Sequence, residues 1–279
     1  MQHPYSEKRA VLATLHQKGE LIAPEFLQAL GMVIEEVAVD TDSLGTFSGE
    51  IERIGSARDV VLNKARLGIK ASGCPRGLAS EGSIGADFYI PFIQSDVELI
   101  GFVDEELGIE LVESYRSTDI TAHTMTIDSP TDLNDFLKKA DFPHHKLIVR
   151  SANKPITYCV KGISTEAVLL QAIADGLQQS PSLIVESDLR AHCSPSRAEN
   201  IKKAAAKMAA RLAQLCPDCS APGWGVTGYI KGLPCAECGE VSEDALKSEI
   251  LGCARCSFTH EGKSLAEVID PSRCNLCNP

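Results

Sequence analysis

The residues with the clearest chemical signature are cysteines near the C-terminus. Four Cys-x-x-Cys pairs lie between residues 216 and 277 of a chain with eleven cysteines. One pair gives two thiolates to a metal ion, so two pairs complete a tetrahedral Zn(Cys)4 site. The alternatives are disulfides or an iron–sulfur cluster, and the two-residue gaps together with a reducing compartment favour zinc. We expect two structural zinc ions bound by Cys216, Cys219, Cys235, Cys238, Cys253, Cys256, Cys274 and Cys277.

The spacing leaves open which pairs share an ion. The fourteen residues between Cys238 and Cys253 are typical of one zinc ribbon, formed by the second and third pairs. The first and fourth pairs would then share the other ion in a nested arrangement. The rival is sequential pairing, first with second and third with fourth. In either case a closed Zn(Cys)4 site has no open position for a substrate, so any chemistry is expected upstream.

Length and composition predict two domains. The chain has 279 residues, of which 44% are hydrophobic. We expect an α/β domain over residues 1–213 and a small double zinc-ribbon domain over residues 214–279. No run approaches the roughly 20 apolar residues of a membrane helix, and the first residues lack a signal-peptide pattern. A cytoplasmic location is therefore expected, with reduced thiols.

The charge balance is acidic throughout. The formal net charge is -11, and from Leu215 onward five Lys or Arg residues stand against nine Asp or Glu residues. A ribbon that binds nucleic acid needs a basic face to neutralise phosphates, and this ribbon lacks one. The tail is better interpreted as a module for stability or for contact with a protein partner.

Hydrophobic periodicity predicts alternating strands and helices in the first 213 residues, which is typical of a mixed α/β sheet. Strands are expected at residues 11–14, 33–39, 97–103, 109–115, 123–127, 146–150, 156–160 and 183–185. Helices are expected at residues 24–30, 56–72, 131–140, 165–175 and 196–215, the last with a capping box of Ser196 and Glu199. Residues 77–85 are expected to be a strand that breaks into a glycine-rich turn at Glu81.

Carboxylates at expected strand ends suggest a magnesium site. Residues 40–50 form an acidic, glycine-containing segment that ends in Glu50, and Glu81 stands at the expected strand break. Magnesium prefers oxygen ligands and keeps several waters, so such carboxylates could hold it. A solvated acidic loop is the alternative for residues 40–50, and a turn with an incidental glutamate is the alternative for Glu81.

The segment after residues 183–185 carries further charges. If the chain stays extended, Glu186, Asp188, Arg190 and His192 point to one face, because strand side chains alternate with period two. The carboxylates would hold metal or orient water, and Arg190 would bind a phosphate. Lys161, before a Ser-capped helix start, is a candidate anion contact. Salt-bridged surface residues are the alternative for this segment.

The whole sequence resembles a bacterial protein family without an assigned activity, whose members share the motifs ATLHxK, DTDxxGTFxxE, KAR, GLASEGSIG, KGI, ESDLRAH and the four cysteine pairs. Residues 11–85 are more remotely similar to the inosine/xanthosine triphosphatase superfamily, which hydrolyses non-standard purine nucleoside triphosphates with Mg2+. The matching residues are Ala13-Thr14, Lys18, Thr46-Phe47, Glu50, Lys64-Ala65 and Glu81-Gly82. His16 stands where that superfamily has Asn, and Ser80-Glu81 replaces a pair of Asp residues.

The resemblance implies a nucleoside triphosphate phosphohydrolase or pyrophosphatase acting on a nucleotide or another phosphorylated small molecule. The candidate catalytic residues are Glu50, Glu81, Glu186 and Asp188, with Mg2+ as cofactor. The candidate substrate contacts are Thr14, His16, Lys18, Lys161, Arg190 and His192. The alternative function is a non-enzymatic ligand-binding or scaffold protein that docks a partner through its zinc ribbons.

Overall fold

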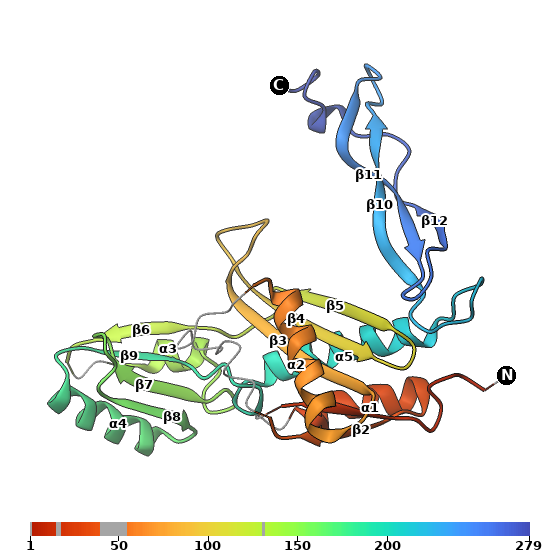
Figure 1. Ribbon diagram of the computed structural model, residues 1–279. Coiled ribbons are helices and arrows are strands. Elements are labelled where there is room, and N and C mark those ends of the chain that lie inside the picture. The colour runs from red at the N-terminus through yellow and green to blue at the C-terminus, as the bar shows by residue number, and fades with distance from the viewer. Residues whose placement is uncertain (1, 15–17, 40–54, 130–131) are drawn as a thin grey trace.

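The computed structural model describes residues 2–14, 18–39, 55–129 and 132–279. Three sheets lie along the molecule (Figure 1). A five-stranded central sheet is flanked on one side by a four-stranded second sheet, and a three-stranded ribbon projects away from it. The architecture is therefore mixed α/β with a mixed sheet, followed by a cysteine-bearing ribbon, as the sequence predicted. In the described part of the chain, no helix has the length and apolar character to cross a membrane.

The first half of the central sheet is parallel and is connected by helices. Strand β1 (Arg9–Ala13) pairs with β2 (Val33–Val37) on one side and with β3 (Arg76–Ala86) on the other. Helix α1 (Gly19–Leu30) leads from β1 to β2, and α2 (Ala57–Ser72) leads onward to β3. Strand β2 therefore lies on one side of β1, and β3, the next strand in the chain, lies on its other side. In α/β sheets such a switch point, at the carboxyl ends of the strands, is the usual place for a ligand.

The second half of the central sheet is antiparallel. Strand β4 (Gln94–Asp104) pairs with β3 along its whole length, and β5 (Ile109–Ser117) forms the outer strand. Helix α5 (Pro195–Ala213) packs with α1 on one face of this sheet, while α2 covers the opposite face. Alternation along the strands explains the two cores, because side chains of one strand point to both faces in turn.

The ends of α2 follow their sequence signals, whereas the start of α5 does not. Ser56 accepts the N–H of Asp59 in a capping box, and Gly73 ends α2 with a φ of 72°. The predicted capping box of Ser196 and Glu199 is wrong, because α5 begins at Pro195. The Ser196 hydroxyl instead accepts the backbone N–H of Thr121 from the connection before the second sheet.

The second sheet is antiparallel and has a core of its own. Its strand order is β6-β9-β7-β8, with α3 and α4 packed against it. The predicted elements in this region are present, with shifted ends. The bounds are β6 Thr124–Ile127, α3 Asn134–Lys139, β7 Leu147–Ser151, β8 Cys159–Ile163, α4 Glu166–Gln179 and β9 Leu183–Ser187. Helix α4 is capped by the side chain of Thr165 rather than by the expected serine.

Two local predictions about charged segments are wrong. Strand β3 runs through Glu81 without a break, so the glycines that follow it do not make a turn there. Strand β9 ends at Ser187, and the chain forms a short 3-10 helix over Ala191–Cys193. Glu186, Asp188, Arg190 and His192 therefore do not share one strand face.

The ribbon is a long hairpin with one added strand. Strand β10 (Gly225–Pro234) pairs with β11 (Val241–Gly252), and β12 (Thr259–Ser264) pairs with the other edge of β11. At about 3.3 Å per residue, the ten residues of β10 separate the two ends of the hairpin by roughly 30 Å. The division of the chain at residues 213 and 214 stays a prediction.

Candidate ligand site and candidate metal centres

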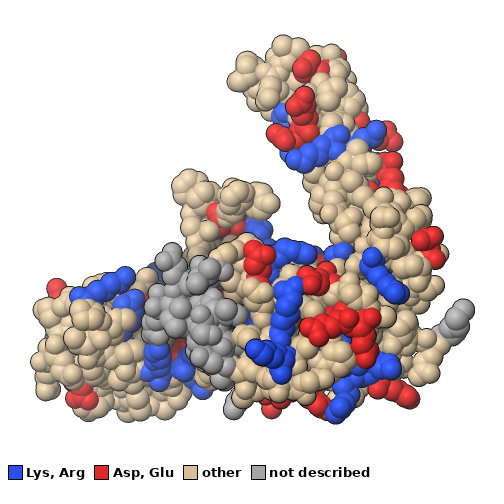
Figure 2. Space-filling model, in the orientation of Figure 1, with Lys and Arg blue, Asp and Glu red and all other residues tan. Residues whose placement is uncertain are grey.

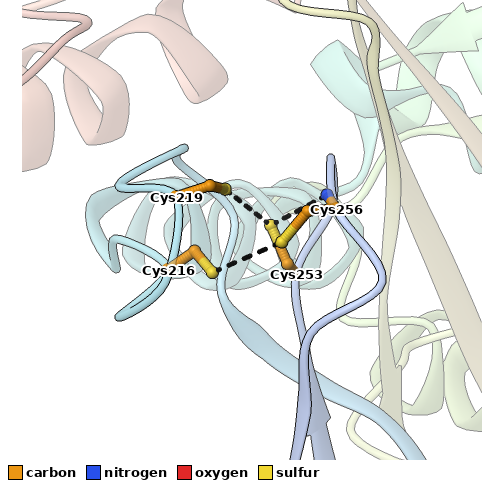
Figure 3. A group of neighbouring side chains, drawn as sticks. All are labelled: Cys216, Cys219, Cys253 and Cys256. Atoms are coloured by element: carbon orange, nitrogen blue, oxygen red, sulfur yellow. Dashed lines mark hydrogen bonds between the residues drawn. The ribbon is translucent and has the colours of Figure 1, made fainter.

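The first four-cysteine group lies where the ribbon meets the central sheet (Figure 3). It consists of Cys216, Cys219, Cys253 and Cys256. Sγ atoms of facing residues are 3.8 Å apart for Cys216 and Cys256, and 3.6 Å apart for Cys219 and Cys253. Four thiolates at about 2.3 Å from a tetrahedral zinc ion would be separated by roughly 3.8 Å. The observed separations therefore fit zinc and exclude disulfides, whose sulfurs are about 2 Å apart.

The second group lies at the far end of the ribbon and consists of Cys235, Cys238, Cys274 and Cys277. Its facing Sγ atoms are also 3.6 and 3.8 Å apart. The first pair thus joins the third, and the second joins the fourth. Both pairings considered from the sequence, nested and sequential, are wrong.

The hairpin explains this interleaved pairing. Because β10 and β11 are antiparallel, Gly225 at the start of β10 lies opposite Gly252 at the end of β11. The cysteine pairs that precede β10 and follow β11 therefore meet at one end. The pair after β10 lies at the other end, where the bridge between Cys235 and Ile269 brings the last pair alongside it.

A cluster of charged side chains lies just beyond the carboxyl end of β1. Strand β1 stops pairing with β3 at Leu78, so the next residues of β3 have no partner in β1. There the ammonium group of Lys18 donates to the hydroxyl of Ser80 over 2.9 Å. On the opposite face, Lys64 from α2 forms a 2.7 Å ion pair with Glu81, and both side chains are buried.

Two further carboxylates of this cluster come from β4 and are held by α5. Arg197 donates through Nε to Oε1 of Glu98 over 2.6 Å, and Asn200 donates to Oδ2 of Asp96 over 2.9 Å. Asp96 and Glu98 are completely buried. Among the described residues, the second oxygen of each carboxylate has no hydrogen-bond donor while both groups are ionised, although a protonated Asp96 can donate to Glu98. A buried polar atom left in this way costs free energy and calls for an explanation.

The surroundings shift the proton affinity of two groups. Burial, and then the positive charge of Arg197, lowers the pKa of Lys18 to about 8, although Glu98 and Glu81 oppose the shift. Burial, and then the negative charge of Glu98, raises the pKa of Asp96 to about 7. Both groups therefore titrate close to neutral pH, a property that is common in functional sites.

A glycine makes room for the central ion pair. Gly82 lies opposite Glu98 in the register of β3 and β4. A Cβ atom on Gly82 would stand 2.5 Å from Nη2 of Arg197 and 2.5 Å from Oε1 of Glu98. The glycine-rich run that predicted a turn is thus explained, at this position, by close packing of charged side chains.

Several predicted site residues lie in the second sheet rather than in this cluster. Glu186 on β9 forms a two-bonded ion pair with Arg150 on β7. The buried Asp188 carboxylate binds Arg190 and also accepts the N–H of Gly162. The backbone of this segment nevertheless touches the cluster, since the carbonyl of Leu189 accepts a 2.7 Å bond from Arg197.

The remaining predicted contacts are more scattered. Thr14 directly follows β1, where its N–H donates to the carbonyl of Val37. Lys161 and His192 are exposed on the second sheet and on the 3-10 helix. Glu50 and His16 lie outside the described residues.

Sequence reasoning missed four members of the cluster: Asp96, Glu98, Arg197 and Asn200. A signal for two of them was present, because Arg197 and Asn200 continue the buried stripe of α5 through Ile201 and Ala204. Basic residues of an amphipathic helix usually lie on its solvated face, but Arg197 is buried. The sequence gives no such signal for Asp96 and Glu98, because acidic residues at alternate positions of a strand are also typical of a solvated face.

A third group of possible metal ligands consists of Asp141, His144 and His145. One oxygen of Asp141 lies 2.9 Å from Nδ1 of each histidine. The Nε2 atom of His145 accepts the backbone N–H of Ser196, so the ring proton is on Nδ1 and is donated to Asp141. His145 therefore caps the start of α5, and its Nδ1 is not free for a metal.

Residues 64–279 match the family described as "Domain of unknown function (DUF6671)". The chain belongs to this family. No curated protein matches the chain. One solved structure with weak similarity is a nucleoside-triphosphatase, dITP/XTP pyrophosphatase, from Mycobacterium abscessus. Its TM-score is 0.27 and its identity 17%, over 39% of this chain and 70% of that chain.

The first resemblance stated from the sequence, to a family without an assigned activity, is thus confirmed. The match covers the cysteine-bearing ribbon and most of the central sheet, including the elements that carry Lys64, Glu81, Glu98 and Arg197. The weak structural similarity adds nothing to the assignment of individual residues.

Proposed function

We propose that the chain binds a phosphorylated small molecule, a nucleotide in the first instance, at the carboxyl ends of β1 and β3 and hydrolyses its phosphoanhydride bond. The observation that carries this proposal is the charged cluster, in which Lys18 and Arg197 lie with Asp96 and Glu98 on one face of the sheet and Lys64 pairs with Glu81 on the other. The cluster lies at the switch point of the sheet, where helix-connected parallel strands leave space for a ligand.

Stability alone is a poor reason for such a cluster. Removing two opposite charges from water costs about as much free energy as their attraction returns, and apolar replacements are often neutral or stabilising. The pairs of Lys64 with Glu81 and of Arg197 with Glu98 are both buried. Charged groups kept in these positions are better explained by a ligand whose own charges complete the cluster.

Lys18 is the favoured phosphate contact. Within the described part of the chain, its ammonium group donates to the neutral Ser80 hydroxyl, whereas Lys64 and Arg197 are in ion pairs. A pKa of about 8 leaves Lys18 mostly protonated at pH 7. A phosphate oxygen that displaces Ser80 would gain a charge-assisted hydrogen bond.

The carboxylates fit Mg2+ as the cofactor of this reaction. Magnesium takes oxygen ligands, and Oε2 of Glu98 is a buried acceptor without a partner among the described residues. Glu98, oriented by Arg197, would hold the ion, which when bound lowers the pKa of a water and neutralises phosphate charge. Glu81 stays a predicted catalytic residue that Lys64 orients on the opposite face of β3, and Glu50 stays a predicted further ligand.

The test is a screen of the purified, zinc-loaded protein against nucleoside di- and triphosphates with Mg2+, with release of phosphate and pyrophosphate as the readout. Lys18→Met and Glu81→Gln should each reduce turnover by about 100-fold or more, since each removes a group that acts on the transition state. Lys70→Met is the matched control, because Lys70 lies exposed on the same helix as Lys64.

The thermal unfolding midpoint of each variant separates loss of the site from loss of the fold. If no member of the panel is hydrolysed but one raises the midpoint of the wild type and not of Lys18→Met, the site binds a ligand without turning it over. That result would favour the non-enzymatic binding function. If the panel shows neither turnover nor binding, the proposed site is refuted.

A further inference from the structure

A loop with an exposed apolar tip projects from the central sheet between β3 and β4 (Figure 1). It comprises residues 87–93, Asp-Phe-Tyr-Ile-Pro-Phe-Ile, and we call it the finger. Phe88, Tyr89 and Phe92 expose 87%, 75% and 96% of their surfaces. Figure 2 shows the finger as a projection that consists mainly of uncharged residues. Side chains of this size are normally buried, so a cluster of them at a tip indicates a contact surface.

The finger is held in a fixed conformation. Asp87 is buried at its base, and one oxygen of its carboxylate accepts the N–H groups of Tyr89 and Ile90, each over 2.9 Å. The other oxygen is paired with Arg116 from β5. The base is closed by a 2.9 Å bond from the N–H of Asp87 to the carbonyl of Ile93.

The aromatic side chains are ordered as well. The rings of Phe88 and Tyr89 pack edge to face at 5.2 Å, and the guanidinium of Arg116 lies 5.4 Å from the centre of the Tyr89 ring. A surface that is already ordered loses little conformational entropy when it is covered. The finger is therefore built for contact, and its exposure is not the result of an irregular loop.

The area of the finger suits a complex of two chains. At about 200 Å² for an accessible aromatic side chain, the three aromatic residues expose roughly 500 Å² per chain. Two copies together would bury roughly 1,000 Å² from these residues alone, which is about the smallest area of a specific interface. The partly exposed Ile90 and Ile93 add to this area.

Charge argues against a lipid surface as the occupant. The only charged residue of the finger is Asp87, and its charge is balanced by the ion pair with Arg116. An anionic leaflet attracts basic segments, which the finger lacks. We propose that the finger is the centre of a symmetric homodimer, in which Phe88, Tyr89 and Phe92 of two chains pack against each other around a twofold axis.

Sedimentation velocity on the full-length, zinc-loaded protein tests this. The wild type is expected to sediment with twice the 29.9 kDa mass of one chain at high concentration. Phe88→Ser together with Phe92→Ser should raise the dissociation constant by about 100-fold or more, since central aromatic residues dominate interfaces of this size. Val168→Ser with Leu170→Ser is the control, because these residues expose 49% and 55% of their surfaces on α4.

The finger variant should keep the thermal unfolding midpoint of the dissociated wild type, because its side chains support no core. A wild type that stays monomeric at all concentrations would overturn the proposal, as would a dimer that the finger variant leaves intact. A monomer that floats with vesicles of phosphatidylcholine and phosphatidylserine, and stops doing so in the finger variant, would also overturn it and assign the finger to lipid.

Discussion

The ribbon and the central sheet differ in the amount of apolar core that can stabilise them. The ribbon has a small apolar cluster around Leu233 and Ile269, and this cluster already includes the cysteines Cys235 and Cys274. The central sheet has an extensive apolar core on one face and a second core on the other. We therefore expect the ribbon to depend on bound metal for its fold, whereas the central sheet has enough apolar core to contain buried charges.

The difference teaches which polar residues to interpret as functional. In the ribbon, polar chemistry replaces the missing core, so the cysteines are structural. The central sheet has apolar cores on both faces, so we expect it to fold without the buried charges. Polar groups that a region could do without are the better candidates for binding and catalysis.

Removal of metal should have the largest effect and should be confined to the ribbon. Structural zinc contributes apparent binding free energies of about 10–16 kcal/mol, which this small domain cannot replace. A strong chelator is expected to unfold residues of the ribbon and to leave the central sheet folded. Hydrogen exchange measured by mass spectrometry, before and after chelation, would show this. Loss of protection in β1 and β3 as well would contradict the comparison.

Paired cysteine substitutions sharpen the same point. Cys216→Ser with Cys253→Ser alters a single site in the interleaved arrangement, so the protein should keep one zinc ion. Cys216→Ser with Cys235→Ser alters both sites and should bind none. Nested and sequential pairings both predict that the first of these variants loses both ions, so metal analysis of the purified proteins separates the three arrangements.

Breaking the ion pair of Arg197 and Glu98 should have the next largest effect. Arg197→Met leaves the completely buried Glu98 without a counter-charge, which is expected to cost about 3–5 kcal/mol of unfolding free energy. Adding Glu98→Leu should restore most of this stability, since no charge then remains unpaired. Urea unfolding of both variants measures the difference. If the double variant is the less stable of the two, the pair supports the fold after all.

The raised pKa of Asp96 predicts that the stability of the protein depends on pH. Its pKa is raised from 3.8 to about 7 in the folded protein, so the folded state binds more protons than the unfolded state between these values. Wild-type stability should therefore fall as the pH rises from about 4 to 7, by up to a few kcal/mol. Asp96→Asn can donate to Glu98 as protonated Asp96 would, and it should remove this fall. If the thermal unfolding midpoints of the wild type and Asp96→Asn change with pH in the same way, Asp96 is not the group responsible for the fall.

Crowding at Gly82 should have the smallest effect. Gly82→Ala places a Cβ atom 2.5 Å from both partners of the Arg197 ion pair and should cost about 1–3 kcal/mol. Gly85→Ala on the same strand is the control, because a Cβ atom there meets no other atom within 4 Å. Equal unfolding free energies for the two variants would show that the ion pair can move aside, and that β3 does not hold the cluster rigidly.

The sequence by itself determined the elements and the chemistry that depend on near neighbours. Helix α2 follows from its own periodicity and from its cap residues Ser56 and Gly73. The Cys-x-x-Cys spacing indicated metal-binding groups, because two ligands in one turn need no distant partner. The mixed α/β class followed in the same way from alternating strand and helix patterns.

Only the tertiary structure decided which distant residues meet. The pairing of the cysteines depends on the direction of β10 and β11, which the spacing between pairs does not encode. The charged cluster joins Lys18, Lys64, Glu81, Glu98 and Arg197 from five separate elements or connections. A glutamate on a strand is paired, exposed or catalytic according to what packs above it, and that is a property of the assembled fold.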